Sequence, residues 1–352
     1  MRIPTVPPLH RSLHRWLRLA LVAACAPVAA RAQGPFTSLT FFGDSYSDTG
    51  NAYLLTLGLE PPSPPYATGR FSNGPIWVDY FAQALGRPSG ATPAFLTRAA
   101  SGDYAVASAR TTGSLISTQA QIGSYLSRLG TTPGTVTDPT GLYALFAGGD
   151  DLRDAGSIAD AATRQAAAAT AARNVVTQAG LLAASGARDV LLFSLPSLGA
   201  TPEAQGIAGR PAIDDQLAST FDATLAAGLA GLHHAYGATT FFDFRLDNLF
   251  ANILHDAANG GSLYGLTNVS TPCLGPPVGP AGAPSCNVSV FADSLHPTTR
   301  TDQLIAQAAA RYVTTGQNVT PTPEPTAGWL VGIGVLAVAG IAGATDARRR
   351  RA

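Results

Sequence analysis

Five short apolar segments alternate with longer stretches of helical character, and this alternation constrains the fold more than any other feature of the sequence. We predict strands at Leu39–Phe42, Tyr104–Ala107, Leu142–Ala147, Val190–Ser194 and Thr239–Phe242. We predict helices at Ile76–Leu85, Ile116–Leu129, Ala159–Ala184, Ile213–Tyr236, Leu246–Ala258 and Thr301–Thr314. Strands separated by helices favour a parallel sheet with helices on both faces. Such an α/β fold binds its ligands in loops at the carboxyl ends of the strands.

The first 32 residues have the pattern of a secretory signal peptide. They carry five arginines and no acidic residue, and their apolar run, Leu19–Ala30, is too short to span a bilayer. The small residues Ala30 and Ala32 stand at positions −3 and −1 of the expected cleavage site, which follows Ala32. The alternative is lipoprotein processing at Cys25, because residues 22–25 (Val-Ala-Ala-Cys) loosely fit a lipobox.

A second apolar run, near the C-terminus, predicts a transmembrane anchor. Residues 327–344 carry no charge, and these eighteen residues are just long enough to cross a hydrocarbon core of about 30 Å as a helix. The tail, residues 345–352, contains four consecutive arginines and should stay cytoplasmic. The tripeptide at 323–325 (Pro-Glu-Pro) followed by this run resembles the PEP-CTERM sorting signal of exosortase-processed bacterial surface proteins. We therefore expect a linker at 313–326 and a sorting protease of exosortase type as a partner.

The charged residues exclude several classes of function. Every basic residue is Arg, and the absence of Lys excludes a Walker-type phosphate lysine and a Schiff-base lysine. Residues 33–320 hold 13 Arg and 20 acidic residues, a net charge of −7, with no Arg-rich stripe. Nucleic acid is therefore not an expected partner. No Gly-x-Gly-x-x-Gly motif follows a strand and no His, Cys and Asp cluster has metal-ligand spacing, so we expect neither cofactor nor metal.

Two cysteines lie outside the expected signal peptide. Twelve residues separate Cys273 from Cys286, in a loop rich in Gly and Pro. In an oxidising compartment we expect them to form a disulfide that closes this loop. A two-cysteine metal site is the alternative, but no His lies nearby to complete it.

Two segments far apart in the sequence carry residues suited to nucleophilic catalysis. Ser45 follows the first predicted strand and leads into a helix, whose first amides suit an oxyanion. The alternative is that this serine only caps the helix. A hydroxyl needs a positioned base and the base needs an orienting group; His296 and Asp293, three residues apart, would supply both. The chain has no Gly-x-Ser-x-Gly motif, which argues against an α/β-hydrolase.

Taken in order, these segments resemble the GDSL, or SGNH, family of esterases and lipases. Four segments are similar to the family's blocks: residues 43–51 (GDSYSDTGN), 103–109 (DYAVASA), 148–152 (GGDDL) and 293–298 (DSLHPT). The resemblance implies a three-layer α/β/α sandwich with a central parallel five-stranded sheet over residues 33–312. It also implies a catalytic triad of Ser45, Asp293 and His296.

The same resemblance implies an oxyanion hole made by the backbone N–H groups of Ser45 and Ser108 and by the side chain of Asp150. The family usually has Gly at the second of these positions and Asn at the third. An amide donates a hydrogen bond, whereas an ionised carboxylate only accepts and repels a developing oxyanion. One hypothesis is that Asp150 is held neutral by Asp151 and an apolar pocket, so that it donates and the enzyme favours acid. The alternative is that another donor fills the hole.

The sequence therefore predicts an exported, surface-anchored serine carboxylesterase or lipase that acts on a lipid or an acylated carbohydrate. One alternative is an O-acetyl esterase of surface polysaccharide. Another is a catalytically silent surface or carbohydrate-binding protein on the same fold, which Asp150 would suit. The stretch Tyr53–Tyr66, with leucines at 54, 55, 57 and 59, could form an acyl pocket or an ordinary core-packing helix.

Overall fold

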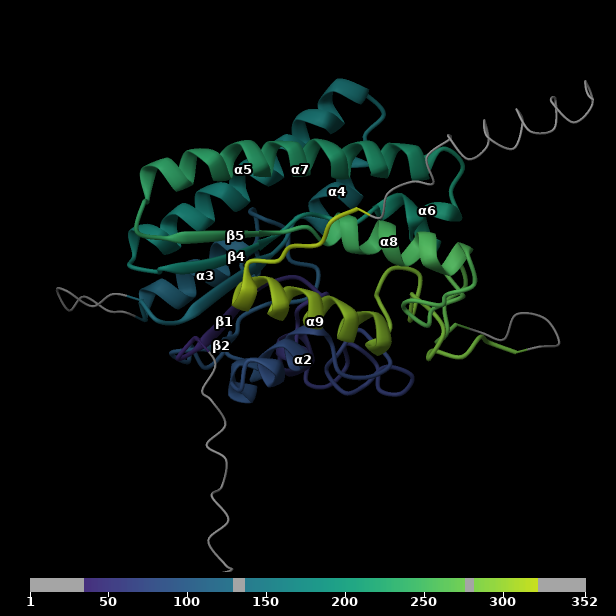
Figure 1. Ribbon diagram of the computed structural model, residues 1–352, viewed down its shortest axis with the longest axis horizontal. Helices are drawn as coiled ribbons and strands as arrows, with labels where there is room; N and C mark the ends of the chain where they lie inside the picture. Colours follow the sequence, from purple (N-terminus) through teal and green to yellow (C-terminus); the bar gives the residue numbers. More distant parts are fainter. Residues whose placement is uncertain (1–34, 129–136, 276–281, 322–352) are drawn as a thin grey trace, which may run out of the picture.

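A computed structural model of the protein describes residues 35–128, 137–275 and 282–321 (Figure 1). Its strands are β1 (Leu39–Gly43), β2 (Gly102–Asp103), β3 (Leu142–Phe146), β4 (Asp189–Phe193) and β5 (Thr240–Phe244). Its helices are α1 (Asn51–Leu55), α2 (Trp77–Ala84), α3 (Thr118–Ser127), α4 (Gly149–Ala155), α5 (Ala161–Ala184), α6 (Pro202–Gln205), α7 (Arg210–Ala235), α8 (Leu246–Ala258) and α9 (Thr299–Thr315).

The two expected targeting elements lie outside this description. The signal peptide at 1–32, the apolar run at 327–344 and the basic tail at 345–352 all fall on residues that it does not cover. Within the described ranges, none of the helices combines the length and the apolar character that a transmembrane span requires.

The five strands form one parallel sheet, as predicted. Their order is β2-β1-β3-β4-β5, and each neighbouring pair is parallel. Every residue of β1 and β3 is buried. A parallel strand covered on both faces has no solvent side, which explains why these segments are almost entirely apolar in the sequence.

Helices cover both faces of the sheet and make the predicted three-layer sandwich. In Figure 1, α5 and α7 lie above the sheet and α2 and α9 below it. The members of each pair pack against one another: α5 on α7, and α2 on α9. Aromatic rings fill the layer between the sheet and α2; Phe146 stacks on Phe193 with centroids 4.7 Å apart, and Trp77 of α2 meets Phe193 at 4.8 Å.

The edge strand β2 does not overlap the segment that we predicted, because side chains take the place of strand-to-strand hydrogen bonds there. We predicted a strand over Tyr104–Ala107, but β2 ends at Asp103. The Tyr104 N–H still donates to Phe41 O in β1, at 2.8 Å. On the outer side, Asn51 Nδ2 donates to the carbonyls of Asp103 and Ala105, both at 2.8 Å. The outer backbone groups are thus paired without a further strand.

The strand order explains why Ser45 and Asp150 lie at one crevice of the sheet, between the loops that follow β1 and β3. From β1 the chain moves outward to β2 and then returns across the sheet to β3 on the other side of β1. The loops after β1 and β3 therefore diverge at their carboxyl ends, where open α/β sheets bind ligands. Ser45 follows β1 and Asp150 follows β3, and Gly43 pairs with Phe146 just before the two loops separate.

The segment expected as a linker, residues 313–326, begins packed on the domain. Its first three residues form the last turn of α9, which ends at Gly316 with φ of +73°. Further on, Asn318 Oδ1 accepts from Arg245 N at 3.1 Å and Asn252 Nδ2 donates to Thr320 O at 2.9 Å. Side chains of α8 and the end of β5 therefore hold the chain as far as Thr320.

Candidate active site

Ser45 stands on a tight turn directly after β1. Gly43 ends the strand so close to β3 that a Cβ there would lie 2.4 Å from Phe146 O. The N–H groups of Ser47 and Asp48 both donate to Asp44 O at 3.0 Å, and Tyr46 N donates to Asp44 Oδ1 at 3.0 Å. These bonds close the turn around Ser45 and point its side chain away from the strand. The serine is buried among these residues, with 8% of its surface exposed.

His296 and Asp293 meet Ser45 in one hydrogen-bonded chain. Ser45 Oγ lies 2.8 Å from His296 Nε2, and His296 Nδ1 lies 2.7 Å from Asp293 Oδ2. The loop that carries the two residues is held by Tyr46, whose hydroxyl donates to Leu295 O at 2.9 Å. Ser45 and His296 are 251 positions apart in the sequence, yet the three side chains form the geometry of a nucleophile, a base and an orienting carboxylate.

Asp293 is held as a carboxylate by four donors. Its Oδ1 accepts the N–H groups of Leu295 and His296 at 2.8 and 2.7 Å. Its Oδ2 accepts His296 Nδ1 and also the hydroxyl of Tyr66, which lies at 2.7 Å. Burial raises the pKa of Asp293, but the hydrogen bonds and charge of His296 and the Tyr66 hydroxyl outweigh it and leave that pKa well below its ordinary value. A fixed negative charge thus faces the imidazole.

Two backbone N–H groups remain available beside Ser45. Neither Ser45 N nor Ser108 N has a hydrogen-bond acceptor among the described residues. Ser108 has φ of +64°, in the left-handed region that favours glycine, so the loop keeps the shape of a glycine turn despite the side chain. The neighbouring Ala107 N donates to Asp48 Oδ2 at 2.8 Å and fixes this loop against the Ser45 turn.

Asp150 lies in the same site but does not have the environment that the sequence suggested. It lines a small cavity with Asp44, Ser45 and Leu295. Its Oδ1 accepts from Arg153 Nη1 at 3.0 Å, so Asp150 is an ion-pair partner, and the hypothesis of a neutral acid that donates finds no support in this contact. At the neighbouring Asp44, burial and then the charge of Asp150 place the pKa of the carboxyl well above its ordinary value.

Sequence reasoning missed two residues of this site, Tyr66 and Arg153. Tyr66 stands 227 positions from Asp293, and no local pattern marks it. Arg153 had a weak signal, because it follows Asp150 by three residues on α4, the spacing of a helical ion pair.

Cys273 and Cys286 are joined by a disulfide, which stands close to the triad loop. The Cys273 N–H donates to Phe291 O at 3.2 Å, and the next N–H, of Leu274, donates to Ala292 O at 2.8 Å. The disulfide-closed loop therefore supports the chain just before Asp293. Among the described residues, no group of His, Cys, Asp and Glu has the arrangement of a metal site.

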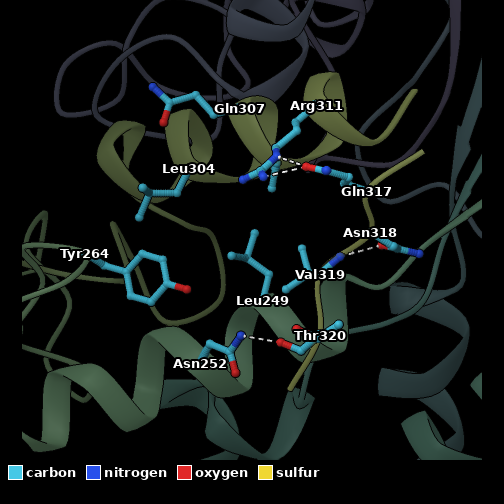
Figure 2. Close-up of a pocket in the computed structure, with 11 residues that line it drawn as sticks. Leu249, Asn252, Tyr264, Leu304, Gln307, Arg311, Gln317, Asn318, Val319 and Thr320 are labelled. Atoms are coloured by element: carbon cyan, nitrogen blue, oxygen red, sulfur yellow. Dashed lines mark hydrogen bonds between the residues drawn. The ribbon is translucent and has the colours of Figure 1, made fainter. Parts of the chain in front are cut away.

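A separate pocket of about 470 Å³ lies between α8, α9 and residues 317–320 (Figure 2). Leu249, Tyr264 and Leu304 point into it, and Arg311 at its rim is paired with Gln317. It contains none of the residues singled out in the sequence. The nucleophile geometry, and not the size of a cavity, therefore locates the candidate active site at Ser45.

Residues 39–309 match the family described as GDSL-like Lipase/Acylhydrolase. The chain belongs to this family, and it is an ester hydrolase of the GDSL type. It is 30% identical over 264 residues to the phosphatidylcholine-sterol acyltransferase of Aeromonas hydrophila, a match that covers 73% of this chain and 71% of that protein. It is 28% identical over 358 residues to esterase EstA of Pseudomonas aeruginosa, covering 88% of this chain and 52% of the relative. The chain thus spans about half the length of EstA.

Among solved structures, the native aryl esterase of M. smegmatis is similar over 78% of this chain and 97% of its own. The identity is 17% and the TM-score 0.39. A likeness of this degree says nothing about the substrate.

Proposed function

We propose that the protein is a serine carboxylesterase whose nucleophile is Ser45, and that its esters carry apolar acyl groups. The observation that carries the proposal is the unbroken chain from Ser45 Oγ through His296 to Asp293, with distances of 2.8 and 2.7 Å. A serine that only capped a helix would not need an imidazole at hydrogen-bond distance, with a carboxylate on the other ring nitrogen.

The proposed reaction follows from this geometry. His296 Nε2 takes the proton of Ser45 as Oγ attacks the ester carbonyl carbon, and Asp293 stabilises the imidazolium that forms. The N–H groups of Ser45 and Ser108 donate to the oxyanion of the tetrahedral intermediate. His296 returns the proton to the leaving alcohol, which leaves an acyl group on Ser45. Water, activated by the same imidazole, then releases the carboxylic acid and restores the serine.

An exposed apolar loop supports the preference for apolar esters. The leucine loop, residues 54–59, presents Leu54, Leu55, Leu57 and Leu59 to solvent, with exposed fractions of 50, 40, 92 and 73%. Of the two alternatives for this stretch, the core-packing helix is wrong, because α1 ends at Leu55 and all four leucines are exposed. No charged residue stands between Asn51 and Leu59. An uncharged cluster of this kind is typical of a surface that contacts lipid or another apolar partner.

The leucine loop belongs to the segment that forms one wall of the active site. At the end of this segment the Tyr66 hydroxyl donates to Asp293, and the Phe71 ring lies 5.2 Å from the His296 ring, centroid to centroid. An apolar surface on the same segment that contacts the triad favours esters that present acyl chains at an interface over acetyl groups on a hydrated polysaccharide.

Changing the loop separates these two substrate classes. We expect Leu57→Ser/Leu59→Ser to hydrolyse soluble p-nitrophenyl acetate within about twofold of the wild type, since the triad is untouched. Hydrolysis of tributyrin above its solubility limit should fall at least about tenfold, because two leucines that would enter the droplet are lost. The matched control is Leu181→Ser, which changes another exposed leucine (46%). Leu181 stands near the C-terminus of α5, just before β4, and therefore lies at the amino ends of the strands, opposite the carboxyl ends that carry Ser45. Equal loss on both substrates, or hydrolysis of acetylated xylan alone, would contradict the apolar preference.

We also propose that the protein is exported and anchored at the cell surface. The basic and apolar pattern of residues 1–32 and the run at 327–344 support this, and a Cys273–Cys286 disulfide suits an oxidising compartment. An exosortase-type protease would then process the C-terminus. N-terminal sequencing of the protein from its native envelope should find Gln33 first; a chain that begins at Met1 would refute export by this route, and one that begins at a lipidated Cys25 would favour the lipoprotein alternative.

A further inference from the structure

Asp150 creates an electrostatic problem at the centre of the site. Its carboxyl lines the same small cavity as Ser45, on the first turn of α4. A negative charge there opposes the oxyanion that forms when Ser45 attacks an ester, and in a site closed to water that opposition is weakly screened. Ester hydrolysis therefore requires that the carboxylate be neutralised, or that it point away from the oxyanion.

Arg153 is the cation that meets this charge. Its Nη1 donates to Asp150 Oδ1 at 3.0 Å, and its side chain lines the Ser45 cavity. The other edge of the guanidinium makes two bonds to Glu203, from Nε at 2.9 Å and from Nη2 at 2.7 Å. A planar fork bound on two edges has a fixed position, which a lysine at this point would not have.

Glu203 ties this arginine to the triad loop. Its backbone N–H, at the start of α6, donates to Ser294 O at 2.8 Å, between Asp293 and Leu295. The arginine's own carbonyl accepts from Arg210 Nη2 at 2.6 Å, and Arg210 is paired in turn with Asp214 on α7. Arg153 therefore stands in a network that joins α4, α6 and α7 to the loop of the base.

We propose that Arg153 is a positioning residue for the oxyanion site: it neutralises Asp150 and turns its carboxylate away from the oxyanion, so that the pair replaces a neutral amide. The inference rests on the proposed function, because it concerns the charge that Ser45 generates during ester hydrolysis. In this proposal the ion pair of Asp150 and Arg153 takes the place of a single asparagine side chain. The effect of changing Arg153 should therefore depend on whether the Asp150 carboxylate is present.

A double-mutant cycle tests this dependence. We expect Arg153→Gln to lower kcat for p-nitrophenyl acetate about 100-fold, the scale of one lost oxyanion donor, with KM changed less than about threefold. In the Asp150→Asn background, Arg153→Gln should change kcat by roughly threefold or less, because no carboxylate is left to neutralise. Arg153→Lys keeps the charge but not the two-edged fork, so it should recover part of the loss. It serves as the second variant if Arg153→Gln folds poorly.

Arg245→Gln is the matched control. Arg245 is exposed to the same degree as Arg153 (35 and 36% of the side chain) and is also paired with a carboxylate, Asp247, but it lies outside the Ser45 cavity. This variant should keep kcat within about twofold, and melting temperatures of all variants show whether loss of fold explains a loss of rate. An equal effect of Arg153→Gln in both backgrounds, or no effect in the wild type, would overturn the inference alone. A wild type without Ser45-dependent turnover would overturn the proposed function and the inference with it.

Discussion

Ser45→Ala is expected to lower kcat for p-nitrophenyl acetate by about 10⁵-fold or more, to a rate that binding and the oxyanion donors alone supply. The physical reason is that no acyl-enzyme can form without Oγ, and His296 then has no proton to accept at 2.8 Å. Steady-state kinetics with enzyme concentrations high enough to detect the residual rate provide the measurement.

Ser47→Ala is the control for this variant. Ser47 lies on the same turn and is fully buried, but its Oγ accepts from Trp77 Nε1 at 3.2 Å and does not contact His296. We expect kcat within about tenfold of the wild type, with a modest loss of stability from the unpaired indole N–H. Retention of more than 1% of activity in Ser45→Ala would mean that another group attacks the ester.

Asp293→Asn is expected to lower kcat by about 10⁴-fold while KM changes little. The carboxylate accepts His296 Nδ1–H at 2.7 Å and so fixes the tautomer that leaves Nε2 free to act as a base. An amide turned to donate to Nδ1 would favour the opposite tautomer, and an amide offers no charge to the imidazolium in either orientation. Kinetics at saturating ester, compared with the wild type between pH 5 and 9, measure the effect.

Tyr66→Phe separates the effect of one hydrogen bond to Asp293 from the effect of the carboxylate itself. It removes one of the four donors to Asp293 and leaves the bond to His296 in place. We expect a loss of about tenfold in kcat, the scale of one hydrogen bond to a charged group. A loss as large as that of Asp293→Asn would show that Tyr66 and not Asp293 orients the base.

The sequence predicted the sheet well because burial on both faces leaves a simple pattern. The strands β1, β3 and β4 are mostly apolar runs bounded by turns, and their predicted limits differ from the observed ones by at most one residue at each end. The prediction was worse at β2, since there the backbone is paired by the side chain of Asn51, which stands about 50 residues earlier at the start of α1. No local pattern reports such a pairing.

The same distinction applies to the site. Ser45, Asp293 and His296 lie in short segments whose residue types and spacing indicate their chemistry. Asp150 lines the same cavity as Ser45, but the sequence did not reveal its partner, because the position of Arg153 depends on Glu203, which stands 50 residues further along the chain. The exposed leucine loop was ambiguous for a similar reason: helical spacing of leucines indicates an apolar face and does not reveal what covers it.

The account depends most on a Ser45 that is activated by His296, and covalent labelling tests this directly. A fluorophosphonate reacts when an activated serine Oγ attacks phosphorus and expels fluoride. We predict one adduct per chain, located by mass spectrometry on the tryptic peptide that contains Ser45, and no adduct in His296→Ala at the same probe concentration and time. A folded wild type that takes up no probe, or that takes it up at another residue, would contradict the account.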